Sequence, residues 1–278
     1  MGRPKGSKSK KTIQKERVKT IKKLPTWLII ILVIAIIAFG VWYYFNVYVD
    51  KPNIDNPQDE IKNNVKDGTI YLGKEGTTSP ELKVTFLDLY GNSNNQQIGD
   101  SIFIEYGDID ILIDAGEKAS GSCTVVPFLL EHVEDKKLEM IITTHADSDH
   151  LGGMVGLSGK DMYGALEAPG IEYQYIVDFG YEADSKVYKD YVELRNARVQ
   201  EGATYLSIKE IFNEENLEAA AHFYLGEDMF LDFLDYKTYG MADIDDDNDR
   251  SVSCLLTHGE KKICLLYTSP SPRDSWAS

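Results

Sequence analysis

The 278-residue sequence has room for one ordinary domain and accessory segments, and its 43% hydrophobic residues can fill a core. Its net charge of −16 is uneven: residues 1–24 carry ten Lys/Arg against one acid, whereas the remaining 19 Lys/Arg and 44 Asp/Glu leave a balance of −25. The three cysteines exclude a disulfide framework, and because no Cys-x-x-Cys pair or Cys/His cluster occurs, a thiolate zinc site is also excluded.

A long apolar run follows the basic arm. No charged residue occurs from Leu24 to Val49, and a membrane-spanning helix needs only about 20 apolar residues. Trp and Tyr flank the run, as is typical of the two membrane interfaces. We predict a cytoplasmic arm at 1–24 and a single transmembrane anchor at 25–49 in contact with the lipid bilayer of the cell membrane. The Lys/Arg excess places the later residues outside the cell. A cleaved signal peptide is the alternative, but its apolar core is shorter and ends in small residues.

Residues 50–80 are rich in Asn, Asp, Gly, Pro and Lys and predict a polar linker. The following region, 81–263, alternates short β-branched and aromatic runs with a few helical patterns, which predicts an α/β domain of sheets flanked by helices. The expected helices are 122–133 and 184–200, and the expected strands are 83–90, 101–106, 109–114, 138–144, 229–236 and 251–257.

The C-terminal residues 264–278 are anomalous. A strand pattern begins at Glu260–Ile263 and then gives way to a Ser/Pro-rich stretch without apolar periodicity. We interpret this stretch as a foreign tail, and we expect the natural domain to have continued with further strands and a helix.

The sequence His145-Ala-Asp147-Ser-Asp149-His150 places four potential metal ligands within six residues, directly after a predicted buried strand. A turn into a helix would bring the four side chains to one point. Imidazole and carboxylate without thiolate suit zinc, manganese or iron better than calcium, which prefers oxygen ligands. Gly152 and Gly153 allow the loop to bend and the following helix to pack closely. A solvated polar loop is the alternative.

This loop, Thr144-HADSDHLGG-Gly153, resembles the signature of the metallo-β-lactamase superfamily, and in particular the extracellular domain of ComEC-type DNA-uptake proteins. The stretches 84–90, 99–101, 111–116 and 248–256 resemble other parts of that domain. The resemblance implies an αββα sandwich that holds two divalent ions, zinc or manganese. It implies that His145 and Asp147 hold the first ion, that Asp149 and His150 hold the second and act in catalysis, and that Asp114 braces the loop by hydrogen bonds.

The resemblance also exposes a departure from the family. An acid that bridges the two ions would come from a Thr-Gly-Asp turn after Lys261–Cys264, but the chain has Tyr267-Thr268-Ser269 there, and a later histidine is absent too. Two other acidic features have simpler interpretations. Asp235 is a weak candidate for an additional ligand, and a surface carboxylate is the simpler interpretation. Asp243–Asp249 looks like a calcium loop but lacks the glycine and terminal Glu of an EF-hand, so we interpret it as a solvated acidic turn.

Three functions remain open from the sequence. The first is a membrane-anchored extracellular hydrolase of phosphodiester or other ester-type bonds, with nucleic acid as the substrate that the family suggests. The acidic balance of −25 argues against a polyanionic substrate. The second is a hydrolase of small substrates such as lactams, thioesters or cyclic esters. The third is a non-catalytic surface module or an inactive fragment. No protein partner can be inferred.

Overall fold

The computed structural model describes residues 65–66, 69–73, 80–90, 99–157, 162–213, 221–234 and 247–265. The chain divides into two units, Met1–Ile54 and Asp55–Ser278, and every described residue belongs to the second. The predicted arm, the predicted anchor at 25–49, Asp235 and nearly all of the tail therefore lie outside the described residues. Within the described part of the chain, no helix has the length and apolar character needed to cross a membrane.

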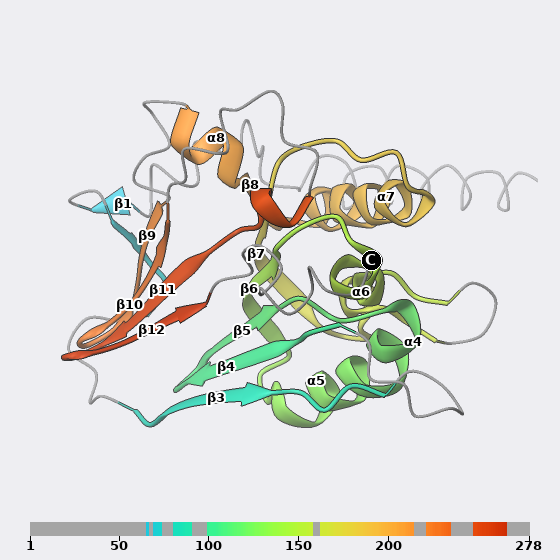
Figure 1. Cartoon of the computed structure of the whole chain (residues 1–278). Coiled ribbons are helices and arrows are strands. Elements are labelled where there is room, and N and C mark those ends of the chain that lie inside the picture. Colours follow the sequence, from blue (N-terminus) through green and yellow to red (C-terminus); the bar gives the residue numbers. More distant parts are fainter. Residues whose placement is uncertain are drawn as a thin grey trace, which may run out of the picture. The chain divides into compact units, whose positions relative to one another are not determined.

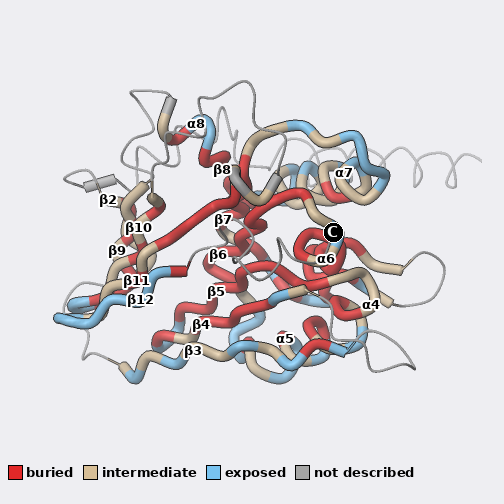
Figure 2. The backbone as a smooth tube through the Cα atoms, viewed as in Figure 1, coloured by how far each residue is buried: buried red, intermediate tan, exposed pale blue. Residues whose placement is uncertain are grey.

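Six strands form the first sheet, sheet B, in the same order in space as in the sequence (Figure 1). The first three are antiparallel and the last four are parallel, so the carboxyl ends of β5 to β8 lie along one edge. Their bounds are β3 Leu82–Phe86, β4 Ile102–Tyr106, β5 Ile109–Ile113, β6 Lys137–Thr143, β7 Glu172–Asp178 and β8 Thr204–Ser207. Because β5 and β6 are buried along almost their whole length, they form the centre of the sheet (Figure 2).

The second sheet, sheet A, joins two strands from the N-terminal side to four from the C-terminal side, in the order β1-β2-β9-β10-β11-β12. Its strands are β1 Val65–Lys66, β2 Thr69–Tyr71, β9 His222–Gly226, β10 Met229–Phe233, β11 Cys254–His258 and β12 Lys261–Leu265. The prediction of a linker over the whole of 50–80 is wrong for β2, because Ile70 is fully buried and β2 pairs in parallel with β9.

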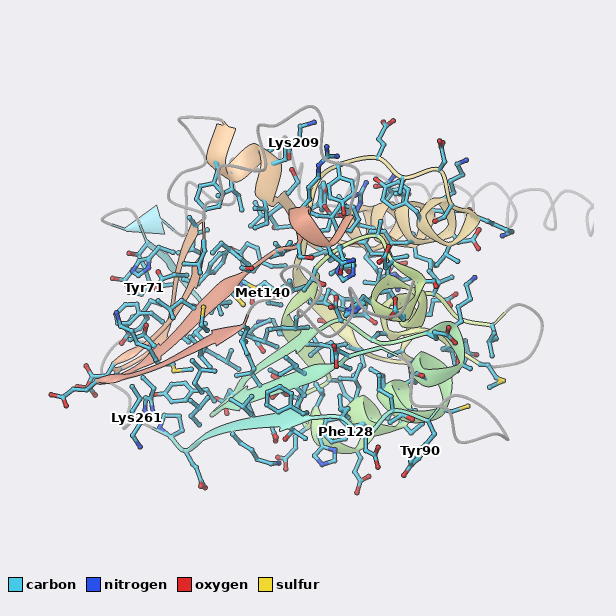
Figure 3. All side chains as sticks on the ribbon, viewed as in Figure 1. Tyr71, Tyr90, Phe128, Met140, Lys209 and Lys261 are labelled. Carbon is cyan, nitrogen blue, oxygen red and sulfur yellow. The ribbon has the colours of Figure 1, made fainter. Side chains whose placement is uncertain are left out.

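The two sheets face each other, and helices cover the opposite face of sheet B (Figure 1). The ring of Tyr175 in β7 meets that of Phe223 in β9 at 5.5 Å, and Met140 of β6 lies in the same packed layer (Figure 3). On the other face, Phe103 of β4 packs edge-on against Phe128 of α5. The helical segments are α4 Lys118–Ser120, the π-helix η2 Gly121–Val125, α5 Val126–His132, α6 Ser148–Leu151, η3 Gly152–Met154, η4 Ala165–Glu167, α7 Lys186–Gln200, α8 Ile208–Asn213 and η7 Asp247–Arg250.

The mixed α/β prediction is confirmed, with two sheets and a helical layer on sheet B. Strands β7, β8 and β9 were not predicted, and the predicted strands 83–90 and 229–236 end earlier, at Phe86 and Phe233. All three cysteines are free thiols. The additional strands and helix that we expect after Ile263 remain a prediction.

A row of acids crosses sheet B at one end and makes stability depend on pH. Asp110 in β5 lies between Glu105 in β4 and Glu139 in β6, and its backbone N–H donates to a Glu139 carboxylate oxygen at 2.9 Å. Burial, together with the charges of Glu139 and Glu105, raises the pKa of Asp110 to about 7. The free energy of unfolding therefore contains a favourable contribution below about pH 4, which is lost as the pH rises to 7.

We expect Asp110→Asn to raise the free energy of unfolding at pH 8 by about 3 kcal/mol and to change it little at pH 4. Urea unfolding of the full chain at both pH values measures this difference. The neighbouring exposed residue supplies the control, because Asp108→Asn should leave stability unchanged at either pH. Equal effects of Asp110→Asn at the two pH values would contradict the assignment.

Candidate metal centre

The loop that follows β6 carries the predicted ligands at the carboxyl edge of sheet B. His145 is fully buried and His150, in α6, is 8% exposed, whereas the side chains of Asp147 and Asp149 are 44% and 42% exposed. In α/β proteins, this edge is where ligands usually bind. The buried histidines therefore form the floor of the site, and the two carboxylates form its solvent side.

Asp114, which directly follows β5, is fully buried and ties the loop to the sheet. One of its carboxylate oxygens accepts the Thr144 N–H at 2.8 Å. The other accepts the Thr144 hydroxyl at 2.6 Å and Nδ1–H of His150 at 2.9 Å. Three hydrogen bonds to one buried carboxylate hold the start of the loop and its end against the same point.

These bonds determine which nitrogen of each histidine carries the proton. The Thr144 hydroxyl gives its only proton to Asp114, so its oxygen accepts Nδ1–H of His145 at 2.9 Å. His150 donates its Nδ1–H to Asp114 directly. In the neutral form of both rings, Nε2 is then deprotonated and can bind a metal ion. A metal-binding histidine usually donates its other ring N–H to a carboxylate, as His150 does to Asp114.

The distances between the Nε2 atoms and the two outer carboxylates fit metal binding. Nε2 of His145 lies 3.7 Å from an Asp147 oxygen, and Nε2 of His150 lies 4.0 Å from an Asp149 oxygen. Two ligand atoms that bind one zinc ion at about 2.1 Å each can be no more than about 4.2 Å apart. The two imidazole rings are 4.2 Å apart between centroids, so the two pairs adjoin each other.

Asp114, His145 and His150 also bring one potential ligand atom each within 4.8 Å of one another. We assign Asp114 a bracing role, because both of its oxygens already accept hydrogen bonds from Thr144 and His150. The donor set available to an ion is therefore two imidazoles and two carboxylates, a set that suits zinc or manganese.

The two histidines differ in their protonation. Burial lowers the pKa of His145 below its usual value, and the nearby His150 lowers it further, so His145 stays neutral. Burial disfavours the charged form of His150 as well, but the hydrogen bond to Asp114 and the negative charges of Asp114 and Asp149 outweigh burial and raise its pKa. The negative charges of Asp114 and Asp149 therefore lie close to His150.

Two glycines allow the loop to approach its neighbours closely. A Cβ at Gly153 would lie 1.9 Å from the carbonyl oxygen of Ala115, which explains the glycine after the motif. Gly99 has φ +86°, and a Cβ there would lie 1.5 Å from the carbonyl oxygen of Asp149. Any larger side chain at either position would displace the segment that carries the ligands.

The segment that leads into β11 completes the surroundings of the loop. The Val252 N–H donates to the Thr144 carbonyl at 2.8 Å, and the amide of Asn248 lies 3.4 Å from an Asp147 carboxylate oxygen. The sequence pattern included Asn248 in the family resemblance but gave it no role. The roles of Thr144 and Asn248 were thus missed, although both residues lie within the quoted motifs.

A buried acid at the end of β7 organises the edge next to the metal loop. Asp178 is 1% exposed and accepts hydrogen bonds from the hydroxyls of Tyr191 and Tyr205, from the guanidinium of Arg195 at 2.9 Å and from the Gly180 N–H. Arg195 also lies 4.0 Å above the Tyr205 ring. This cluster connects β7, α7 and β8, and nothing in its sequence spacing revealed it.

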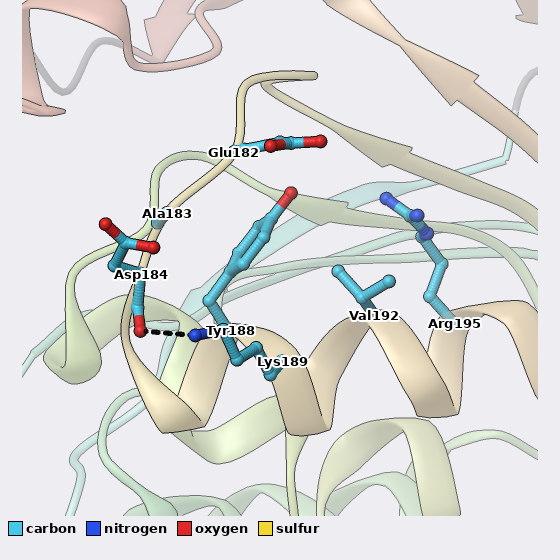
Figure 4. A pocket seen from close by; sticks show the side chains of 7 residues that line it. All are labelled: Glu182, Ala183, Asp184, Tyr188, Lys189, Val192 and Arg195. Atoms are coloured by element: carbon cyan, nitrogen blue, oxygen red, sulfur yellow. Dashed lines mark hydrogen bonds between the residues drawn. The ribbon is translucent and has the colours of Figure 1, made fainter.

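A groove of about 540 Å³ lies beside this cluster, between α7 and the loop that follows β7 (Figure 4). The side chain of Tyr188 extends from α7 into the groove. The ammonium group of Lys189 donates to the Asp184 carbonyl at 3.0 Å. The lining residues are Glu182, Ala183, Asp184, Tyr188, Lys189, Val192 and Arg195. The groove therefore combines an apolar wall with charges of both signs.

Part of the chain is similar to proteins of known family. Residues 95–219 match the family model of the metallo-beta-lactamase superfamily. Among solved structures, the chain is similar to the metallo-beta-lactamase fold protein YhfI from Bacillus subtilis, with 15% identity and a TM-score of 0.35. That match covers 66% of this chain and 61% of YhfI. No curated protein matches the sequence. The matched residues 95–219, which contain Asp114 and the whole His145–His150 loop, are therefore similar to a domain of the metallo-beta-lactamase superfamily, whose members are mostly metal-dependent hydrolases.

Proposed function

We propose that this chain is a metal-dependent hydrolase of phosphodiester or other ester-type bonds, in the ComEC-like branch of the superfamily. The observation that carries the proposal is the hydrogen-bonded unit of Asp114, Thr144, His145 and His150, which turns two Nε2 atoms toward two carboxylates. A purely structural buried cluster has no need to leave two outer carboxylates 44% and 42% exposed beside the imidazole nitrogens. The same unit suits binding of divalent ions.

In this proposal, His145 and Asp147 hold one divalent ion, and Asp149 and His150 hold another. When bound, such ions would lower the pKa of a water and neutralise charge on the ester oxygens. The protein's own part is to hold the Nδ1–H of each ring, on Asp114 for His150 and on the Thr144 hydroxyl for His145, so that each Nε2 is directed toward an ion. The partly exposed Asp149 is placed to accept a proton from an attacking water.

The proposed location follows from the N-terminal sequence. The uncharged stretch within 25–49, preceded by the basic arm, supports a single-pass anchor with the hydrolase domain outside the cell.

The charge of the chain bears on the choice of substrate. The acidic balance of −25 beyond residue 24 favours a small or neutral ester over a long polyanion, so a small-substrate hydrolase of the same fold is the second candidate.

The test is turnover by the purified full chain in detergent after equilibration with zinc or manganese. We expect hydrolysis of bis(4-nitrophenyl) phosphate, and we expect His150→Ala and Asp149→Ala each to lower kcat/KM by at least about 100-fold. His132→Ala is the matched control, because His132 stacks on Phe128 in α5, away from the loop.

Two results would contradict the proposal. One is a folded, metal-loaded chain that cleaves neither this phosphodiester nor neutral nitrophenyl esters. The other is turnover that survives both the His150 and the Asp149 substitutions, which would indicate a contaminating enzyme. Cleavage of the neutral esters alone would select the small-substrate candidate.

A further inference from the structure

Tyr191 is the most deeply buried side chain of helix α7 and has no exposed surface. Its hydroxyl donates to one carboxylate oxygen of Asp178 at 3.0 Å, and the Arg195 guanidinium donates to the same oxygen at 2.9 Å. A buried hydroxyl that would lose its partner by turning away keeps its orientation. The Tyr191 hydroxyl therefore has a fixed position at the end of β7.

The same hydroxyl contacts the end of the strand that leads into the His145–His150 loop. Asp178 pairs with Thr143, the last residue of β6, and the Thr143 hydroxyl donates to the Tyr191 oxygen. Thr143 is 1% exposed and lies two residues before His145. Tyr191 thus connects α7 to the strand end from which the metal ligands follow.

Asp114 and Tyr191 hold two consecutive residues of this strand end. The Asp114 carboxylate accepts both the N–H and the hydroxyl of Thr144. Consecutive side chains of an extended chain point to opposite sides, so the side chain of Thr143 is directed away from that of Thr144. The two threonines are therefore held from two directions, one by Asp114 and the other by Tyr191.

Helix α7 also packs against the other end of the loop. It contacts α6, which carries Asp149 and His150, and η3, which begins at Gly152. The buried hydroxyl of Tyr191 thus fastens a helix that touches the loop both before its first ligand and after its last.

We infer that Tyr191 is a positioning residue of the metal centre, whose hydroxyl fixes Thr143 and thereby the direction of the His145 imidazole. This inference rests on the proposed function, because it concerns the same ions. It deepens that function by adding a residue, on a helix outside the ligand motif, on which ion affinity depends. Groups that orient a metal ligand through hydrogen bonds change metal affinity by about 10- to 100-fold. Tyr191 acts through one further residue, so the lower figure applies.

The test measures the zinc affinity of the purified full chain by competition with a chromogenic chelator. Tyr191→Phe keeps the buried ring and removes the hydroxyl, and we expect it to weaken zinc binding by about 10-fold. Thr143→Val, which has nearly the same shape without the hydroxyl, should give the same loss. The double variant should lose no more than either single variant, because both substitutions remove the same contact. Thr143→Ser, which keeps the hydroxyl, should retain most of the affinity.

Tyr205→Phe is the matched control. The Tyr205 hydroxyl donates to the other Asp178 oxygen at 2.7 Å, so this variant also removes one hydrogen bond from the same carboxylate. Tyr205 lies on β8, however, and β7 separates β8 from β6. We expect the two Tyr→Phe variants to lower the thermal stability of the zinc-free chain by similar amounts, and only Tyr191→Phe to lower the zinc affinity.

Wild-type zinc affinity in Tyr191→Phe, an equal loss in Tyr205→Phe, or additive losses in the double variant would each overturn the inference. If Tyr191→Phe does not fold, Thr143→Val is compared with Thr143→Ser, and equal affinities of these two variants contradict the role of the hydroxyl contact. Zinc binding is measured without turnover. A chain whose zinc affinity depends on Tyr191 but that hydrolyses no ester would therefore contradict the proposed function while supporting this inference.

Discussion

The Asp114→Asn variant is expected to lose about 10- to 100-fold in zinc affinity. An asparagine oxygen can still accept the Thr144 N–H, but the amide nitrogen then faces Nδ1–H of His150. The imidazole must move its proton to Nε2, the atom that should bind the ion. The Thr144 hydroxyl also loses the acceptor that it has on the same Asp114 oxygen, and a buried donor left unpaired costs about 1–3 kcal/mol in the free energy of unfolding. Competition with a chromogenic chelator measures the affinity, and thermal unfolding of the zinc-free chain measures the stability.

Asp228→Asn is a matched control for this substitution. Both aspartates have left-handed backbone conformations, with φ 54° at Asp114 and φ 60° at Asp228, and asparagine tolerates that conformation as well as aspartate does. Asp228 lies exposed in the turn between β9 and β10. We expect its variant to bind zinc as the wild-type chain does. Wild-type zinc affinity in Asp114→Asn would show that Asp114 does not set the tautomer of His150.

The largest loss of stability is expected from Asp178→Asn, at about 3–5 kcal/mol. The substitution removes the negative charge that neutralises Arg195, whose side chain is only 13% exposed. It also disturbs the hydrogen bonds from Tyr191 and Tyr205, which connect α7 and β8 to the end of β7. Urea unfolding of the full chain gives the free energy directly.

The double variant Asp178→Asn/Arg195→Met separates charge from packing. Because it removes both members of the ion pair, it should recover part of the stability that the single variant loses. Asp190→Asn, also on α7, breaks the more exposed pairs with Lys118 of α4 and Lys186 of α7 and should cost less than about 1 kcal/mol. A double variant that is less stable than Asp178→Asn would show that Arg195 contributes mainly by packing on Tyr205.

The metal loop could be located from sequence because its ligand residues are contiguous. An apolar strand, four ligand-type side chains and two glycines follow one another within a few residues, and each has a local physical meaning. The position of β6 and the helical turn after Asp147 followed from the same pattern. The assignments of the four ligands and of Asp114 came from the family resemblance, and metal-binding measurements have to test them.

The parts that sequence reasoning missed depend on residues far apart in the chain. Strand β2 is three residues long and lies in a polar stretch, and only its pairing with β9 buries Ile70. Asp178 at the end of β7 acquires its role from tyrosines on α7 and β8 that its own neighbours do not indicate. Arg250 directly follows the acidic stretch Asp243–Asp249, which the sequence indicated only as a solvated turn, and its position against Tyr181 comes from the folded arrangement.

The division of strands between the two sheets has a consequence for the order of folding. Sheet B is built from strands that are consecutive in the chain, so its contacts can form as soon as residues 82–207 have left the ribosome. Sheet A cannot close until β2 pairs with β9, which follows it in the chain after about 150 residues. Contacts between residues so far apart in the sequence form slowly. Asn248 and Arg250 arrive only with that last stage. A nascent chain is thus expected to form the His145–His150 loop first, and to gain the contacts of Asn248 and Val252 with that loop only after residues 247–252 have been made.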